Sequence, residues 1–225
     1  MNGEQKGAER VIAIGASTGG PSALQQLLPT LPANLPAAIL VVQHMPSGFT
    51  GPLSHHLDSM CQLAVEEAKN ETVVRQGFVY IAPAGLHLTV TRDSRRNAVL
   101  RLAREPSGTL HVPSVDVMMA SVAKLFGRES VGVILTGMGQ DGALGMRAIF
   151  EAGGITMGQD EGSCAIYGMP KACAQLRVLS KVVALEEMAE HILAAVGYRR
   201  ENSFPGREQH LQHLTFQHGR NSNAR

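Results

Sequence analysis

The chain has 225 residues, a formal net charge of +1, 44% hydrophobic residues and 4% aromatic residues. A charge this close to zero argues against nucleic acid as a partner, because nucleic-acid-binding domains carry a strongly basic face. The polar N-terminal stretch and the lack of a long apolar run predict neither a signal peptide nor membrane insertion. Three cysteines without metal-ligand spacing favour reduced thiols and a cytoplasmic protein.

Apolar runs alternate with helical patterns along most of the chain. We expect a flexible N-terminus at 1–10, one folded domain at 11–197 and a polar, disordered tail at 198–225. Strands are expected at 11–14, 38–42, 62–65, 78–81, 86–91, 98–103, 131–135, 155–157 and 182–183. Helices are expected at 21–28, 52–60, 115–126, 143–152, 170–175 and 185–196.

This alternation predicts the fold class. Strands that alternate with helices indicate an α/β fold with a doubly wound, mostly parallel sheet and helices on both faces. The segments 86–91 and 98–103, joined by a polar turn, predict a β-hairpin. The length favours a single domain.

The first predicted strand runs into a glycine-rich turn, which reads Gly-Ala-Ser-Thr-Gly-Gly at 15–20. Pro21 suits the first turn of the following helix, because its missing N–H would have no helical partner there. Such a turn lies at the carboxyl edge of the sheet, where ligands bind in open α/β folds. Ser17, the central hydroxyl of this turn, is either a cap of the helix or a nucleophile.

Two further apolar strands are followed by side chains capable of chemistry, His44 and Asp141. The carboxyl ends of parallel strands meet at one edge, so these residues can converge with Ser17. A serine needs a base to become a useful nucleophile, and the base needs a carboxylate to orient it. Each residue alone has a structural interpretation, as a cap, a strand-end histidine or a turn residue. Their joint placement favours a Ser-His-Asp triad.

Five motifs in a fixed order carry a resemblance to a known family. They are Gly-Ala-Ser17-Thr-Gly-Gly, Gln-His44-Met-Pro with Gly48-Phe49-Thr50, Tyr80-Ile-Ala-Pro-Ala-Gly85, Pro113-Ser-Val-Asp116 and Leu135-Thr-Gly-Met-Gly-Gln-Asp141-Gly. Over residues 11–196 the chain therefore resembles the catalytic domain of the chemotaxis protein-glutamate methylesterases (CheB-type).

The resemblance implies a function and a set of site residues. The family's triad falls on Ser17, His44 and Asp141, and Thr18 and Met138 match positions that line its active site. The implied reaction is hydrolysis of γ-glutamyl methyl esters on chemoreceptor cytoplasmic helices, often with deamidation of receptor glutamines. It proceeds through an acyl-enzyme and requires no metal or organic cofactor. Backbone N–H groups near the Pro21 helix or Met138 are the expected oxyanion donors.

Two departures from the family are visible. The family's usual enzyme has a phosphorylatable receiver domain before the catalytic one, whereas here ten residues precede the first strand. We therefore expect no receiver control in this chain. The segment 107–112 also lacks the basic residues common there in the family, so receptor engagement is expected to differ.

Two alternatives remain open. Tyr167 and Lys171 match the Y-x-x-x-K pattern of short-chain dehydrogenases, which bind nucleotides beside a glycine-rich turn. However, Gly168 and Pro170 disfavour the continuous helix that this pair needs, and the second strand ends without an acidic residue for a ribose. The other alternative is an inactive module that binds receptor helices without hydrolysing anything.

Overall fold

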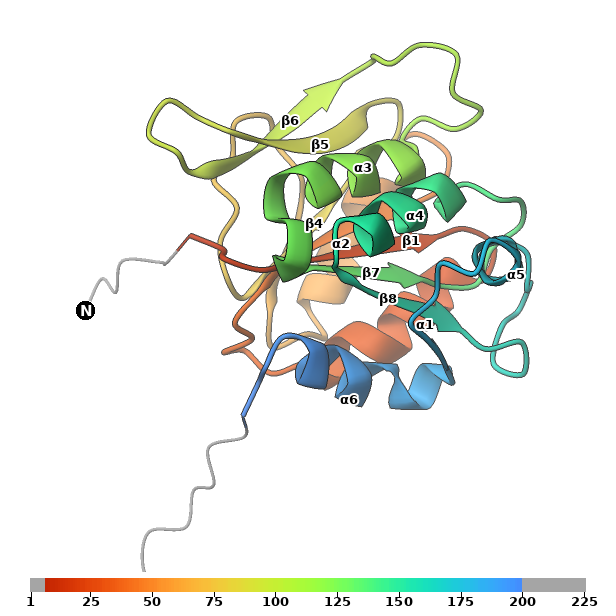
Figure 1. Ribbon diagram of the computed structural model, residues 1–225. Coiled ribbons are helices and arrows are strands. Elements are labelled where there is room, and N and C mark those ends of the chain that lie inside the picture. Colours follow the sequence, from red (N-terminus) through yellow and green to blue (C-terminus); the bar gives the residue numbers. More distant parts are fainter. Residues whose placement is uncertain (1–6, 200–225) are drawn as a thin grey trace, which may run out of the picture.

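The computed structural model describes residues 7–199 and confirms the predicted α/β fold (Figure 1). Seven strands form one sheet in the order β3-β4-β2-β1-β7-β8-β9, and every neighbouring pair in it is parallel. Its strands are β1 (Val11–Ala16), β2 (Ala38–Gln43), β3 (Ala64–Glu67), β4 (Phe78–Ile81), β7 (Ser130–Ile134), β8 (Ile155–Gln159) and β9 (Lys181–Val183). The predicted hairpin is a separate antiparallel pair, β5 (His87–Arg92) and β6 (Ala98–Ala103).

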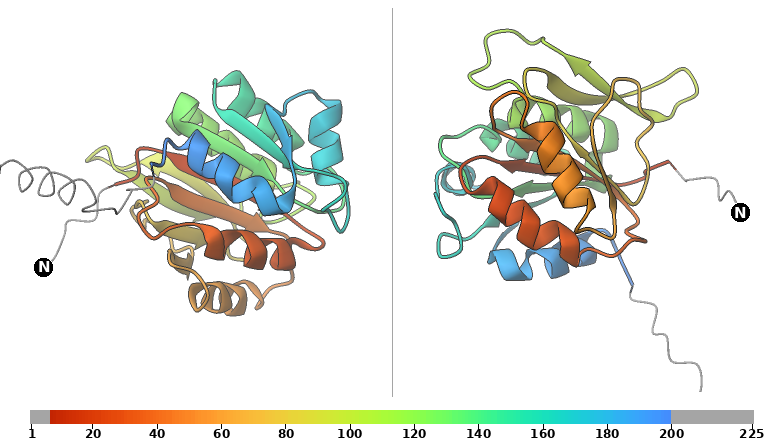
Figure 2. Two further views of the ribbon diagram at one scale, coloured as in Figure 1. Left: turned by 90° about the horizontal axis from the view of Figure 1, so that it is seen from below. Right: turned by 180° about the vertical axis from the view of Figure 1, so that it is seen from behind.

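Helices cover both faces of the sheet. One face carries α1 (Gly20–Leu27), α2 (Thr50–Asp58) and α6 (Leu185–Ala195), as the view from behind shows (Figure 2). The other face carries the hairpin with α3 (Val115–Phe126), α4 (Ala143–Glu151) and α5 (Met169–Gln175). Short 3₁₀ turns follow α1 and α3, at Leu28–Thr30 and Gly127–Glu129.

This double cover explains why the central strands are apolar throughout. Every residue of β1 and of β2 is buried, since alternate side chains pack into the two opposite helical layers. In β1, Ile12 and Ile14 belong to the core under α1 and α6, whereas Val11 and Ala13 belong to the core under α3 and α4. A parallel sheet buried on both faces selects for such runs.

The chain order reverses beside β1, which positions the site. After β1 the chain adds β2, β3 and β4 on one side of β1, and later β7, β8 and β9 on the other side. Ligands of open α/β folds bind at this switch point, outside the carboxyl ends of the strands. The backbone ladder continues past the ends of these strands, from His44 N–H to the Ala16 carbonyl at 3.0 Å and from Ser17 N–H to the Thr136 carbonyl at 3.1 Å.

Contacts extend past the first strand and the last helix at both ends of the described chain. Ala8 N–H donates to the Val74 carbonyl at 2.9 Å, and Gly7 forms an isolated bridge with Arg75. At the other end Tyr198 Oη donates to Asn34 at 3.0 Å. The predictions for 1–6 and 200–225 lie outside the described residues. Within 7–199, no helix combines the length and the apolar character that crossing a bilayer requires.

Candidate active site

Ser17 directly follows β1, in the turn that leads into α1. Its backbone is held on both sides, because its N–H donates to Thr136 and its carbonyl accepts from Gly20 N–H at 2.8 Å and from Gln43 Nε2 at 2.9 Å. The side chain is half-buried. Within residues 7–199, Ser17 Oγ makes no hydrogen bond, so its hydroxyl is available to a bound molecule.

His44 follows β2, the strand beside β1, and its ring contacts Asp141. Nε2 of His44 lies 2.8 Å from Oδ2 of Asp141, and the two side chains are only 9% and 11% exposed. The opposite ring nitrogen, Nδ1, is buried and has no hydrogen-bond partner among the described residues. In the serine-protease template Nδ1 faces the carboxylate and Nε2 faces the serine. The orientation is reversed here, which leaves Nδ1 as the nitrogen that could exchange a proton with a substrate or nucleophile.

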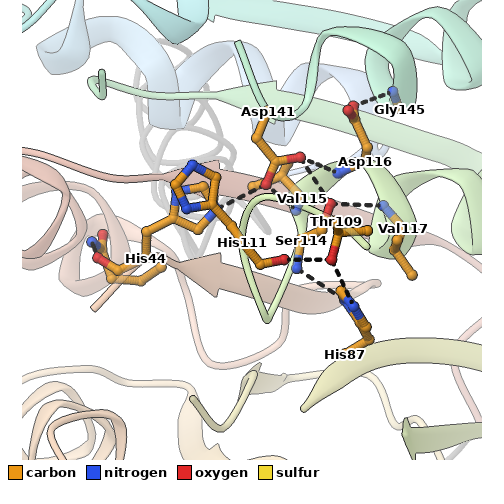
Figure 3. Close-up of polar contacts among 11 residues, drawn as sticks. His44, His87, Thr109, His111, Ser114, Val115, Asp116, Val117, Asp141 and Gly145 are labelled. Atoms are coloured by element: carbon orange, nitrogen blue, oxygen red, sulfur yellow. Dashed lines mark hydrogen bonds and ion pairs between the residues drawn. The ribbon is translucent and has the colours of Figure 1, made fainter. Parts of the chain in front are cut away.

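Asp141 lies at the N-terminus of α3, where unpaired amides and the helix dipole favour an anion. Its Oδ1 accepts from Ser114 Oγ at 2.9 Å and from Asp116 N–H at 3.0 Å, and its Oδ2 accepts from Val115 N–H at 2.8 Å (Figure 3). Burial alone would raise the pKa of Asp141. The hydrogen bonds from His44, from the two amides and from Ser114 outweigh burial and lower this pKa to about 2. The group is therefore a carboxylate at neutral pH.

Two further contacts hold the first turn of α3, which carries the donors to Asp141. Ser114 is the N-cap of the helix, and its Oγ accepts from Val117 N–H at 3.4 Å. Asp116 Oδ1 accepts from Gly145 N–H at 2.7 Å and so ties the start of α3 to the start of α4. Burial and, to a smaller extent, the charge of Asp141 raise the pKa of Asp116. Ser114 and Asp116 stand in the motif Pro-Ser-Val-Asp, but their role toward Asp141 was not predicted.

The loop after β7 lies against Ser17. A Cβ added at Gly137 would lie 2.8 Å from Ser17 Cβ, so only glycine permits this approach. Thr18, the residue after Ser17, is exposed. Met138, the residue after Gly137, is 73% exposed. Within the described chain the backbone N–H groups of Thr18 and Met138 donate no hydrogen bond. Both N–H groups can therefore donate to a ligand at this edge of the sheet.

The site also includes a ring contact that the sequence did not indicate. The imidazole of His111 stacks on that of His44, with ring centroids 4.1 Å apart and an interplanar angle of 23°. A pocket of about 560 Å³ opens beside Asp141. Its lining includes the apolar side chains of Leu110, Val117 and Leu144 and the ring of His111.

The dehydrogenase alternative can be compared with this geometry. Tyr167 lies in an isolated bridge with Gly137, outside α5, whereas Lys171 lies within that helix. The Y-x-x-x-K pair therefore does not share a helix, and the dehydrogenase interpretation loses its support. The described part of the chain also contains no cluster of three or more His, Cys, Asp or Glu side chains suited to a metal ion.

Known proteins resemble this chain over most of its length. A family model described as CheB methylesterase matches residues 12–192. Proteins named protein-glutamate methylesterase/protein-glutamine glutaminase from Moorella thermoacetica and Salmonella typhimurium are 47% and 44% identical over 196 and 189 residues. These matches cover 87% and 84% of this chain but 46% and 54% of the relatives, so the chain spans about half their length.

A solved structure matches the fold closely. The crystal structure of the Thermotoga maritima CheB methylesterase catalytic domain is 36% identical, with a TM-score of 0.80. The match covers 82% of this chain and 97% of the Thermotoga chain.

Proposed function

Because the chain belongs to the CheB methylesterase family, we propose that it is a serine hydrolase that removes methyl groups from γ-glutamyl methyl esters of chemoreceptors. Deamidation of receptor glutamines is the second proposed activity, in line with the names of its relatives. The proposed partners are the cytoplasmic helices of methylated chemoreceptors, and the proposed place of action is the cytoplasm.

One observation carries the proposal. His44 is hydrogen-bonded to Asp141 at 2.8 Å, and it follows β2, the strand next to the one that precedes Ser17. A hydroxyl, an imidazole and a carboxylate thus occur at one edge of the sheet, which is the combination that acyl transfer uses. Without the His44–Asp141 contact, the serine would have no oriented base.

In the first half of the proposed reaction, Ser17 Oγ attacks the ester carbonyl while Nδ1 of His44 takes its proton. The charge that His44 acquires is stabilised by Asp141, which the low pKa of about 2 keeps ionised. The tetrahedral intermediate then collapses and its C–O bond to the methoxy group breaks. The leaving oxygen takes the proton from Nδ1 and departs as methanol, or ammonia departs when the substrate is a glutamine.

In the second half, water replaces the leaving group. His44 Nδ1 removes a proton from water, and the resulting hydroxide attacks the glutamyl ester of Ser17. Collapse of this second intermediate breaks the bond to Ser17 Oγ, which recovers its proton from Nδ1. The product is a glutamate side chain and the free enzyme.

Both intermediates carry a negatively charged oxygen that needs donors. We assign this role to the backbone N–H groups of Thr18 and Met138, which have no partner among residues 7–199. A backbone donor aimed at such an oxygen contributes about 3 kcal/mol to transition-state stabilisation. The assignment predicts that the side chains of the two residues matter less than their amides.

The proposal is tested with a chemoreceptor that carries radiolabelled methyl esters. We expect the full chain to release radioactive methanol and to leave unmethylated glutamates, detected by mass spectrometry of receptor peptides. Glutamines converted to glutamates would appear in the same spectra. Binding of the receptor without methanol release would instead support the inactive binding module, and tight binding of a nicotinamide nucleotide without esterase activity would support a dehydrogenase.

A further inference from the structure

The ring stacked on His44 comes from an otherwise irregular surface loop. His111 lies in the loop between β6 and α3, and its neighbours Leu110 and Val112 are 91% and 40% exposed. His111 itself is half-buried, and its ring lies 4.1 Å from the ring of His44 (Figure 3). This one side chain of the loop is therefore directed at the candidate base.

A buried histidine holds this part of the loop in place. His87, which is 1% exposed at the start of β5, accepts at Nδ1 from Ser114 N–H at 3.1 Å. Its Nε2 must then carry the proton, which it donates to Thr109 Oγ1 at 3.2 Å. Thr109 in turn donates its hydroxyl proton to the His111 carbonyl at 3.0 Å. His87 thus fixes residues on both sides of His111.

The geometry of His44 explains what such a stack can do. The ring of His44 has one hydrogen bond, at Nε2, and its buried Nδ1 has no described partner. A single hydrogen bond restrains the ring along one direction and leaves it able to tilt about that bond. A flat neighbour on its face removes this freedom.

Resting on the proposed function, we propose that His111 is a positioning residue, whose stacked ring keeps Nδ1 of His44 directed toward Ser17. His111 does not exchange protons with the substrate in this account. It is held by Thr109 and His87, so these three residues form one support for the base.

The charges around His111 suit this role. The titratable groups that face it are His44 and Asp141, with Asp116 in the same pocket and His87 behind Thr109. Burial lowers the pKa of His111, and the charge of His44 lowers it further, against the opposing effect of Asp141. A neutral ring is thereby favoured on the face of His44 when His44 becomes charged, and a neutral aromatic face attracts a cation.

The decisive comparison is between His111→Phe, which keeps an aromatic face, and His111→Ala, which removes it. We expect His111→Ala to lower kcat about tenfold with little change in KM, which is the upper end of the effect of one aromatic pair. His111→Phe should recover most of this loss, and Thr109→Val should give an intermediate value. His56→Ala, the same substitution at an exposed histidine of α2, is the matched control and should leave kcat unchanged.

A second measurement does not depend on activity. The proton on Nε2 of His44, shared with Asp141, should give a sharp downfield NMR resonance in the wild type and in His111→Phe. We expect this resonance to broaden by exchange in His111→Ala and Thr109→Val. Thermal unfolding of each variant identifies any that fails to fold. If His111→Ala fails to fold, the comparison of His111→Phe with Thr109→Val tests the positioning role.

The outcomes separate this inference from the proposed function. If the wild type releases no methanol but the resonance depends on the ring at 111, the proposed function fails and the positioning role stands. If His111→Ala and His111→Phe both match the wild type, or both lose activity equally, the positioning role of the stacked ring is wrong.

Discussion

The carboxylate of Asp141 accepts a hydrogen bond from Nε2 of His44 at 2.8 Å, although 97 residues separate the two in sequence. Since Asp141 has a pKa of about 2, it is ionised at neutral pH, and the shared proton belongs to the imidazole. This assigns the tautomer of His44 and leaves Nδ1 as its basic nitrogen. The amides at the N-terminus of α3 hold this carboxylate beside the ring of His44, which directly follows β2.

The depressed pKa of Asp141 predicts how stability depends on pH. An unfolded aspartate has a pKa of about 3.9, so the folded carboxylate stabilises the protein above that value. The stabilisation is lost as the pH falls through about 2, the pKa of the folded state. At pH 7 we expect Asp141→Asn to lower the free energy of unfolding by about 2 kcal/mol.

Urea denaturation between pH 7 and pH 3 measures this difference. The gap between wild type and Asp141→Asn should narrow below about pH 4, where an unfolded aspartate begins to be protonated. Glu105→Gln, at an exposed carboxylate of the β6–α3 loop, is the control and should show no such gap. A constant gap at every pH would mean that the carboxylate is not ionised in the way described.

Ser114→Ala removes two contacts at once, the cap of α3 and one donor to Asp141. Loss of a serine cap costs about 1 kcal/mol of stability. We also expect the pKa of Asp141 to rise, because one of the hydrogen bonds that lower it is gone. Denaturation and NMR titration of the Asp141 carboxyl test these two effects. Ser107→Ala in the neighbouring exposed loop should produce neither effect, and an unchanged titration in Ser114→Ala would contradict the assigned contact.

The close approach at Gly137 predicts a steric effect on the site. A Cβ there would lie 2.3 Å from Met169 Sδ and 2.8 Å from Ser17 Cβ, so the loop must move. We expect Gly137→Ala to reduce kcat/KM by about a hundredfold, because a misplacement near 1 Å has effects of that size. Gly139→Ala in the same loop is the contrast. A Cβ at Gly139 would have no neighbour within 4 Å, and its φ of +89° gives strain without a clash. Equal effects of the two variants would show that the approach to Ser17 is unimportant.

Assignment of the oxyanion donors to backbone groups predicts tolerance of side-chain changes. Thr18→Ala and Met138→Ala keep the N–H groups, so we expect kcat to fall by less than about fivefold, far below the 10²–10³ that a lost donor costs. Steady-state assays on the methylated receptor measure this. A loss of about a hundredfold in Thr18→Ala would instead assign the role to its hydroxyl.

Much of the architecture was predictable, because its signals are local. The buried strands at 11–14 and 38–42 are apolar runs, and the residues after them, Ser17 and His44, follow from the strand ends. Parallel topology then placed these residues at one edge. Both the fold class and the separate hairpin are confirmed.

The remaining features depend on contacts that have no local signature. Which ring nitrogen of His44 faces Asp141 is set by the first turn of α3, far along the chain. His111 lies in a loop without periodicity, and its backbone carbonyl accepts from Thr109, which in turn is hydrogen-bonded to His87. Residues 7 and 8 pair with the segment before β4 through backbone groups alone, so no pattern of side chains predicts this pairing.

The central claim is that Ser17 is the nucleophile at a site where His44 and Asp141 supply the base. It is tested most directly by turnover of radiolabelled methylated receptor by Ser17→Ala, with correct folding verified by its melting curve. We expect kcat to fall by at least about 10⁴-fold, as when a triad serine is removed. Methanol release within about tenfold of the wild type would contradict it, because an enzyme acylated at Ser17 cannot lose that oxygen and keep its rate.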